Sequence, residues 1–133
     1  MRYALDTNII IKYLQDDVNI TNKINEIFAA EVILLIPRIV DYEVRRGLRI
    51  KFAPAKERKY SGLLERCEIL EISEGAWERA IDVYAELYHK RFTVARADIL
   101  IAATCLEHNC ILVTNNTKDF SNVNGLGLAD WTV

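Results

Sequence analysis

The sequence predicts an α/β fold in which helices cover both faces of a central parallel sheet, giving three layers. Apolar runs of strand length alternate along the chain with segments whose apolar residues recur at helical spacing. The strand runs are continuously apolar, which is typical of strands buried on both faces. A chain of 133 residues that is 51% apolar and 27% charged has the size and composition of one globular domain, and we assign residues 1–133 to it.

The first half of the chain supplies two of the predicted strands. Its predicted elements are a strand over 2–5, a helix that follows Asp6 or Thr7 and is closed by Asp16-Asp17, a helix around 20–28, a strand over 32–36 and a helix over 38–50. Asp6 or Thr7 can cap the first of these helices. Pro37 is expected to end the second strand, because proline has no N–H to donate to a sheet.

The second half continues the alternation of helices and strands. Its predicted elements are a helix over 55–67, a strand over 68–72, helices over 74–90 and 95–108, a strand over 111–114 and a last strand over 127–133. The longest helix carries an apolar series with a 3.6-residue period: Trp77, Ala80, Ile81, Tyr84, Leu87 and Tyr88. Active sites of such sheets lie beyond the carboxyl ends of the strands. Asp6 and Asp119, the latter in a predicted loop, both fall there.

Four carboxylates at the edges of predicted elements are the candidate site: Asp6, Glu43, Asp98 and Asp119. Each alone has an ordinary explanation: Asp6 as a helix cap, Glu43 as a surface acid paired with Arg46 or Arg38, Asp98 as an acid in a first helical turn, and Asp119 as a turn residue. One sheet edge could nevertheless gather all of them. Two carboxylates 4 Å apart repel by roughly 4 kcal/mol at an effective dielectric of 20, and a divalent cation offsets this. The group therefore predicts a metal site that acts on phosphates.

The charge of the chain is near balance but is unevenly distributed. The net charge is −2, yet residues 45–59 contain seven basic side chains and one acid, Glu57. This segment either steers a polyanion or is a solvated helix face.

Cysteine usage and hydropathy predict a cytoplasmic protein. Cys67, Cys105 and Cys110 form no CxxC pair and are expected to be buried thiols in a reducing compartment. We find no apolar run of membrane-spanning length and no signal-peptide pattern, and we expect no membrane association.

Other phosphate-handling folds fit the sequence less well. A response-regulator receiver needs an acidic pair after its first strand and a phospho-accepting Asp at the end of a middle strand. An aspartate-nucleophile phosphatase needs Asp-x-Asp, and Asn8 occupies the second position. His89 and His108 lie near predicted helix ends, where imidazolium suits the helix dipole, so neither is expected to be a general base.

Four blocks, in order, resemble the PIN domain: Leu5-Asp6-Thr7-Asn8, Asp41-Tyr42-Glu43-Val44, the run from Ala97 to Ala103, and the run from Leu112 to Phe120. The resemblance extends from Tyr3 to Trp131 and is greatest to the VapC toxins of VapBC toxin-antitoxin pairs. It implies a PIN-like α/β/α domain with a magnesium- or manganese-dependent endoribonuclease activity.

The resemblance assigns roles to individual residues. Asp6, Glu43 and Asp98 would bind the metal ion, and Asp119 would be the fourth catalytic acid. Thr7, Asn8, Thr114 and Asn116 would support them. The sequence departs from many members at Asn116, where they carry an acid, and Asp119 is the nearest replacement. The ion would polarise the scissile phosphate and activate water, with a carboxylate orienting that water or taking its proton.

The resemblance also implies partners. The substrate would be RNA, with tRNA as the expected class, held through phosphates by Arg45, Arg46, Arg49, Lys51 and Lys12. A VapB-type antitoxin would insert near the acids and form a hetero-oligomer, and operator DNA would be contacted only through it. A homodimer is expected, with Ile24, Phe28, Tyr60 and Leu64 as candidate contacts. The alternative is a PIN-fold module that binds RNA or protein without catalysis.

Overall fold

A computed structural model describes residues 1–133 and contains a five-stranded parallel sheet in the order β3-β2-β1-β4-β5. The strands are β1 (Tyr3–Leu5), β2 (Leu34–Pro37), β3 (Cys67–Leu70), β4 (Ile111–Val113) and β5 (Gly127–Ala129). The helices are α1 (Thr7–Leu14), α2 (Val18–Ala29), α3 (Arg38–Lys51), α4 (Pro54–Leu64), α5 (Glu74–His89), α6 (Arg96–Glu107) and α7 (Thr117–Phe120). The predicted three-layer α/β/α class is confirmed.

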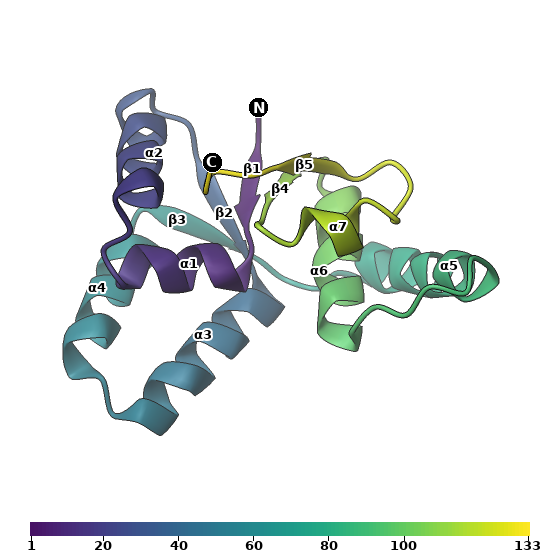
Figure 1. Cartoon of the computed structure of the whole chain (residues 1–133), viewed down its shortest axis with the longest axis horizontal. Coiled ribbons are helices and arrows are strands. Elements are labelled where there is room, and N and C mark those ends of the chain that lie inside the picture. Colours follow the sequence, from purple (N-terminus) through teal and green to yellow (C-terminus); the bar gives the residue numbers. More distant parts are fainter.

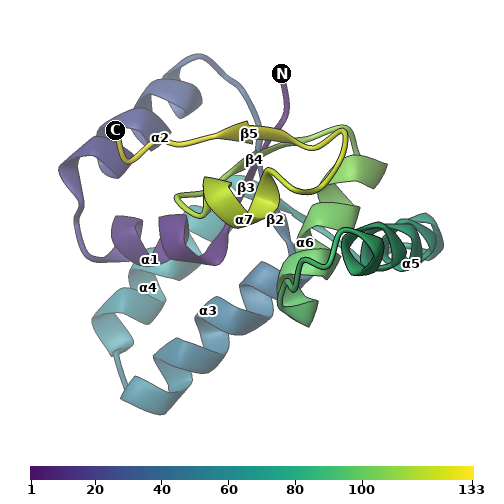
Figure 2. The same cartoon turned by 45° about the vertical axis from the view of Figure 1, so that its right-hand side comes forward.

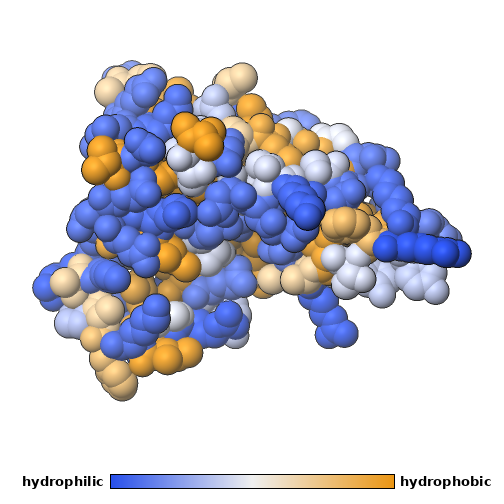
Figure 3. All heavy atoms as spheres, viewed as in Figure 1, coloured by the Kyte–Doolittle hydropathy of each residue, from blue (hydrophilic) through white to orange (hydrophobic).

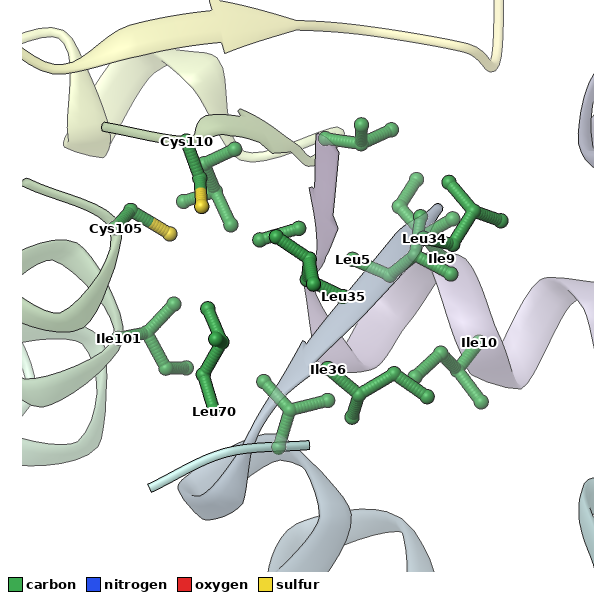
Figure 4. Packing of buried hydrophobic residues seen from close by; sticks show 14 of the residues in the cluster. Leu5, Ile9, Ile10, Leu34, Leu35, Ile36, Leu70, Ile101, Cys105 and Cys110 are labelled. Atoms are coloured by element: carbon green, nitrogen blue, oxygen red, sulfur yellow. The ribbon is translucent and has the colours of Figure 1, made fainter. Parts of the chain in front are cut away.

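Helices lie on both sides of the sheet, with α1, α2 and α4 on one side and α5 and α6 on the other (Figures 1 and 2). Continuous apolar strands require this cover because both of their faces need to be shielded from water. Figure 4 shows Ile9 and Ile10 of α1 on one side of the central strands and Ile101 and Cys105 of α6 on the other. These residues belong to one buried cluster of 31 side chains.

The strand order reverses direction at β1. The chain moves outward from β1 to β2 and β3, and then returns to place β4 on the other side of β1. The carboxyl ends of β1 and β4 are therefore adjacent at the topological switch point, where open α/β sheets bind their ligands. Asp6 and Thr114 are the residues that follow these two strands.

Several predicted boundaries are corrected by the structure. Pro37 is the last residue of β2, in register with Leu70, and α3 begins directly after it, so the missing N–H of Pro37 costs the sheet nothing at that end. β3 begins at Cys67, three residues after α4 ends. β5 ends at Ala129 because its partner β4 has only three residues. Asp119 lies in the short helix α7 instead of a loop.

The exposed surface contradicts the predicted dimer contacts. Ile24 and Tyr60 are buried, and Phe28 and Leu64 pack partly buried against the core. These side chains are inside the fold because α2 and α4 turn their apolar faces to the sheet. On the face shown in Figure 3, hydrophilic side chains dominate, and apolar side chains are scattered among them in small groups.

The structure confirms that the cysteines are unpaired. All three cysteines are free thiols, with Cys105 and Cys110 buried and Cys67 half-buried. Burial raises the pKa of each thiol above its ordinary value, so none is an activated thiolate. Separately, none of the helices combines the length and the hydropathy that crossing a membrane would require.

Candidate active site

Asp6 is held at the switch point by three hydrogen bonds. It caps α1 with extended backbone angles (φ −78°, ψ 161°), and its carboxylate accepts from the Thr7 N–H at 2.8 Å. The other carboxylate oxygen accepts from the Thr114 hydroxyl at 2.7 Å and the Asn8 amide at 3.1 Å. Burial nonetheless raises the pKa of Asp6 above its ordinary value, since only 3% of the residue is exposed. The helix-cap role expected of this residue and its place at the acid cluster are therefore both present.

Glu43 is oriented by α1. The Thr7 hydroxyl donates to the Glu43 carboxylate at 2.7 Å, which joins α1 to α3 directly beside Asp6. The predicted pairing of Glu43 with Arg46 or Arg38 is wrong, because Arg38 contacts Asp41 and Glu71 and Arg46 lies over the Tyr42 ring. Glu43 is thus directed into the acid cluster and away from the basic face of its own helix.

Asp98 completes the cluster from the first turn of α6. Its pKa is raised to about 6, first by burial and then by the negative charges of Asp6, Glu43 and Asp119. No hydrogen bond offsets this, so Asp98 is the acid whose charge is least compensated. Its electrostatic interaction with all of the other acids shows that the fold brings the predicted carboxylates together.

Asp119 is attached to the cluster through Asn116 and Thr114. The Asn116 amide donates to Asp119 at 3.2 Å, and the Asn116 N–H donates to the Thr114 hydroxyl at 3.0 Å. The Asn115 N–H donates to the Asn8 side chain at 3.4 Å. Asn116 therefore holds the Asp119 side chain by a hydrogen bond.

The donor set suits a hard divalent cation. All four acids offer oxygen only, and no His or Cys joins them, which favours Mg²⁺ or Mn²⁺ over zinc. The four side chains do not form a ready-made cage, since no three such groups lie close enough together to enclose an ion directly. Mg²⁺ keeps several waters and commonly binds through one or two carboxylates and substrate phosphates, so the residues fit it.

Basic side chains line a groove on α3, the helix that also carries Glu43. The groove residues are Arg38, Asp41, Tyr42, Arg45, Arg46, Arg49, Ile50 and Glu71. Arg45, Arg46, Arg49 and Lys51 are exposed, and Lys12 on α1 is half-buried. Lys59, by contrast, donates to the Tyr13 carbonyl and pairs with Asp16, so this part of the basic segment is structural.

A buried network behind this groove was not foreseen from the sequence. Asp41 is 2% exposed and accepts from the Tyr60 hydroxyl at 2.8 Å and from Arg38 at 2.9 Å. Arg38 also donates to Glu71 at 2.6 Å. The network fixes α3 against α4 and the end of β3. The three-residue spacing of Arg38 and Asp41 was the available signal.

The stability of the metal-free protein is expected to fall as the pH rises. The Asp98 pKa is about 6 in the fold and 3.8 as the ordinary value, so the folded state binds more protons between these values. The stabilising contribution of Asp98 to the free energy of unfolding is therefore lost as the pH rises from about 4 to about 6. Screening of the half-exposed carboxyl limits the loss to about 1 kcal/mol.

Urea unfolding in chelator at both ends of this range measures the effect. Asp98→Asn is the comparison, because it removes the titration and should gain stability over the parent only at the higher pH. If the free energies of unfolding of the two proteins changed in parallel with pH, the raised pKa could not belong to Asp98.

Comparisons with known proteins agree with this fold. The PIN-domain family pattern matches residues 3–126. Ribonuclease VapC2 of Rickettsia felis is 30% identical over 98% of each chain, and the tRNA(fMet)-specific endonuclease VapC of Salmonella typhimurium is 27% identical over 98% of each. The crystal structure of VapBC2 from Rickettsia felis bound to a promoter DNA fragment superposes with a TM-score of 0.91 at 28% identity, covering 98% of this chain and 99% of that one. The chain therefore belongs to the PIN-domain family, in its VapC group.

Proposed function

We propose that this PIN domain is the toxin of a type II toxin-antitoxin pair and a divalent-metal-dependent endoribonuclease. The observation that carries the proposal is the convergence of Asp6, Glu43, Asp98 and Asp119 at the switch point of the sheet, with the charge of Asp98 uncompensated. The names of the relatives, a ribonuclease and a tRNA-specific endonuclease, support cleavage of RNA.

Different residues of the site would have different roles in hydrolysis. Asp6, Glu43 and Asp98 would hold Mg²⁺ or Mn²⁺, which supplies Lewis-acid activation of the phosphodiester and of water. Thr7 fixes Glu43, and Thr114, Asn8 and the Thr7 N–H fix Asp6, so these carboxylates are positioned before substrate arrives. Asp119, held by Asn116, can orient the attacking water or accept its proton.

The α3 groove is the proposed RNA site, with tRNA as the proposed substrate class. Glu43 and the arginines belong to the same helix, so an RNA chain bound at the acids would reach Arg46 and Arg49 by passing around α3. Exposed Tyr42 adds an aromatic face to the groove. Splayed bases in single-stranded loops suit such a surface, since they stack on aromatic and guanidinium planes.

Replacement of Arg49 by Gln is expected to weaken RNA binding and flatten its salt dependence. Arg49 has no ion-pair partner in its own chain, so its charge is available to a phosphate. Loss of one phosphate contact lowers the log–log salt slope by about 0.7–0.9. The measurement is fluorescence anisotropy with a tRNA, in an Asp98→Asn background. Arg2→Gln, at an exposed residue just before the central strand β1, is the control and should leave the slope unchanged.

The proposed partners follow from the same site. A VapB-type antitoxin would place a basic side chain among the acids, where the uncompensated charge of Asp98 favours a cation. The solved relative is a VapBC complex bound to DNA, and we propose that operator DNA is contacted here only through the antitoxin, since this chain has a net charge of −2. A homodimer is the proposed assembly of the toxin, and the cytoplasm, where it would meet an RNA substrate, is its proposed location.

Incubation of total cellular RNA with the purified chain tests the function. With Mg²⁺ or Mn²⁺ we expect discrete products, and with EDTA none. Sequencing of the product ends would identify the RNA and the cut. A folded, antitoxin-free chain that binds RNA but never cleaves it would favour the alternative, a non-catalytic binding module, in which Asn116 reflects loss of an acid.

A further inference from the structure

Tyr42 is an exposed aromatic side chain in the first half of α3. The residue is 55% exposed and lines the α3 groove. The apolar side chains that α3 gives to the core, Val40, Val44 and Leu48, lie on another face of the helix. Tyr42 therefore adds only part of its surface to the packing of the fold, and its ring is accessible to a ligand.

Arg46 lies over the ring of Tyr42, about one helical turn further along α3. Its guanidinium carbon is 5.0 Å from the ring centroid, within the range of a cation–π contact. The contact holds an aromatic ring and a planar guanidinium together at the surface before any ligand arrives. Nucleobases stack on both kinds of group, and a surface that is already ordered loses less entropy when it binds.

No carboxylate of the chain neutralises the charge of Arg46. Its neighbour three residues earlier on the helix, Glu43, accepts a hydrogen bond from the Thr7 hydroxyl instead. Arg38 and Arg45 of the same groove are each paired with a carboxylate, and no ion pair includes Arg46. The cation over the tyrosine ring is therefore available to a nucleic acid.

The Tyr42–Arg46 pair is close to Glu43 on the helix. Tyr42 directly precedes Glu43, and Arg46 follows it by three residues, a spacing that makes two side chains neighbours on a helix surface. Arg49 lies one turn further along. An RNA chain that passes from the acids around α3 would therefore meet the pair before it meets Arg49. The base that reaches the pair first belongs to a nucleotide beside the cut.

We propose that Tyr42 and Arg46 form a stacking platform for the nucleobase next to the scissile phosphate. The platform deepens the proposed function and rests on it, because it names the two residues of the α3 groove that would hold a base instead of a phosphate. A base inside a duplex has both of its faces covered by neighbouring bases, so only a base that has left its stack can occupy the platform. The two residues would thereby help to select where the RNA is cut.

RNA binding without cleavage tests the platform. The probes are a short fluorescein-labelled oligoadenylate and a ribose-phosphate oligomer that has the same length and charge but no bases. Each is titrated by fluorescence anisotropy with the full chain in EDTA, in the Asp98→Asn background, so that neither is cut. This parent protein should bind the oligoadenylate more tightly, and the difference measures what the bases contribute.

Tyr42→Leu should raise the dissociation constant of the oligoadenylate roughly 5- to 150-fold, the range for loss of one base–aromatic stack, and leave that of the baseless oligomer unchanged. Tyr42→Phe keeps the ring and should bind both probes as the parent does. Arg46→Lys keeps the charge but loses the planar group, so it should weaken oligoadenylate binding without changing the salt slope. Phe52→Leu is the matched control, since Phe52 is an exposed aromatic residue at the end of the same helix and outside the groove. It should bind both probes as the parent does.

Equal losses for the two probes in Tyr42→Leu would overturn the proposal, because the ring would then act on the RNA backbone or on the fold. A Tyr42→Phe variant as weak as Tyr42→Leu would also overturn it, since the hydroxyl would then be the contact. Thermal unfolding checks that each variant is folded. Metal-dependent cleavage of total RNA is measured separately. A chain that cleaves RNA but binds the two probes equally would therefore lose the platform and keep the proposed function.

Discussion

Asp98→Asn is expected to abolish RNA cleavage, with a rate at least about 1,000-fold below that of the wild type. Asp98 carries the least compensated negative charge of the four acids and accepts no hydrogen bond in the free site. An amide keeps its shape but removes the charge that would attract a cation and hold it against the phosphodiester. The loss should therefore appear in the rate of cleavage and in metal affinity rather than in the fold.

The measurement is single-turnover cleavage of the identified RNA over a range of Mg²⁺ concentrations. Asp82→Asn, an exposed acid on α5, is the matched control and should cleave at the wild-type rate. Thermal unfolding with and without Mn²⁺ shows whether the loss of cleavage comes from lost metal binding or from a damaged fold. A ligand that binds only the folded state raises stability by mass action. Wild type should be stabilised by the ion and Asp98→Asn much less. Full activity in Asp98→Asn would remove this residue from the mechanism.

The sheet was predictable because its strands are apolar throughout. Runs such as Leu34-Leu35-Ile36 leave no face for water, and only a covered parallel sheet accommodates them. Their ends were less predictable. The predicted strand covered residues 32–36, whereas β2 begins at Leu34 and ends on Pro37, and α3 follows directly.

Periodicity was an incomplete guide to what lies inside. On α5 it marked Trp77 and Tyr88 as strongly as Leu87, although the core takes the small residues Ala76 and Ala80 and leaves the aromatics outside. A period of 3.6 residues reports an apolar face, and the choice between two such faces depends on the space left by α6. The same limitation made buried Ile24 and Tyr60 look like candidates for a subunit contact.

The acids were identifiable because their positions follow from topology. Asp6 directly follows β1 and Asp98 lies in the first turn of α6, so a parallel sheet directs both to one edge. Their partners were not identifiable, because the bonds join distant segments: Thr7 to Glu43 across 36 positions, and Thr114 to Asp6 across 108. The acids can thus be found from local sequence patterns. The hydroxyl groups that orient them come from distant segments of the chain, and only the folded structure shows those contacts.

Those hydroxyl groups lead to the largest expected change in stability. Thr114→Val is expected to lower the free energy of unfolding by about 2 kcal/mol. Thr114 is fully buried, and its hydroxyl accepts from the Asn116 N–H and donates to the Asp6 carboxylate. Valine has the same branched shape but leaves that N–H without its partner and removes a donor from a buried carboxylate. The Asp6 pKa should rise further as a result, because the hydrogen bond from Thr114 lowers it.

Thr21→Val is the matched control, because Thr21 on α2 also has a buried hydroxyl but has no hydrogen-bond partner. Its replacement should leave stability unchanged or slightly raise it, since an unsatisfied polar group is removed. Urea unfolding of both variants in chelator gives the comparison. Equal losses would mean that the Thr114 hydroxyl is worth no more than any buried threonine, and that Asp6 is held by Asn8 and the Thr7 N–H alone. A loss confined to Thr114→Val would show that the β4 edge positions the β1 acid across the switch point, which makes the strand order itself part of the active site.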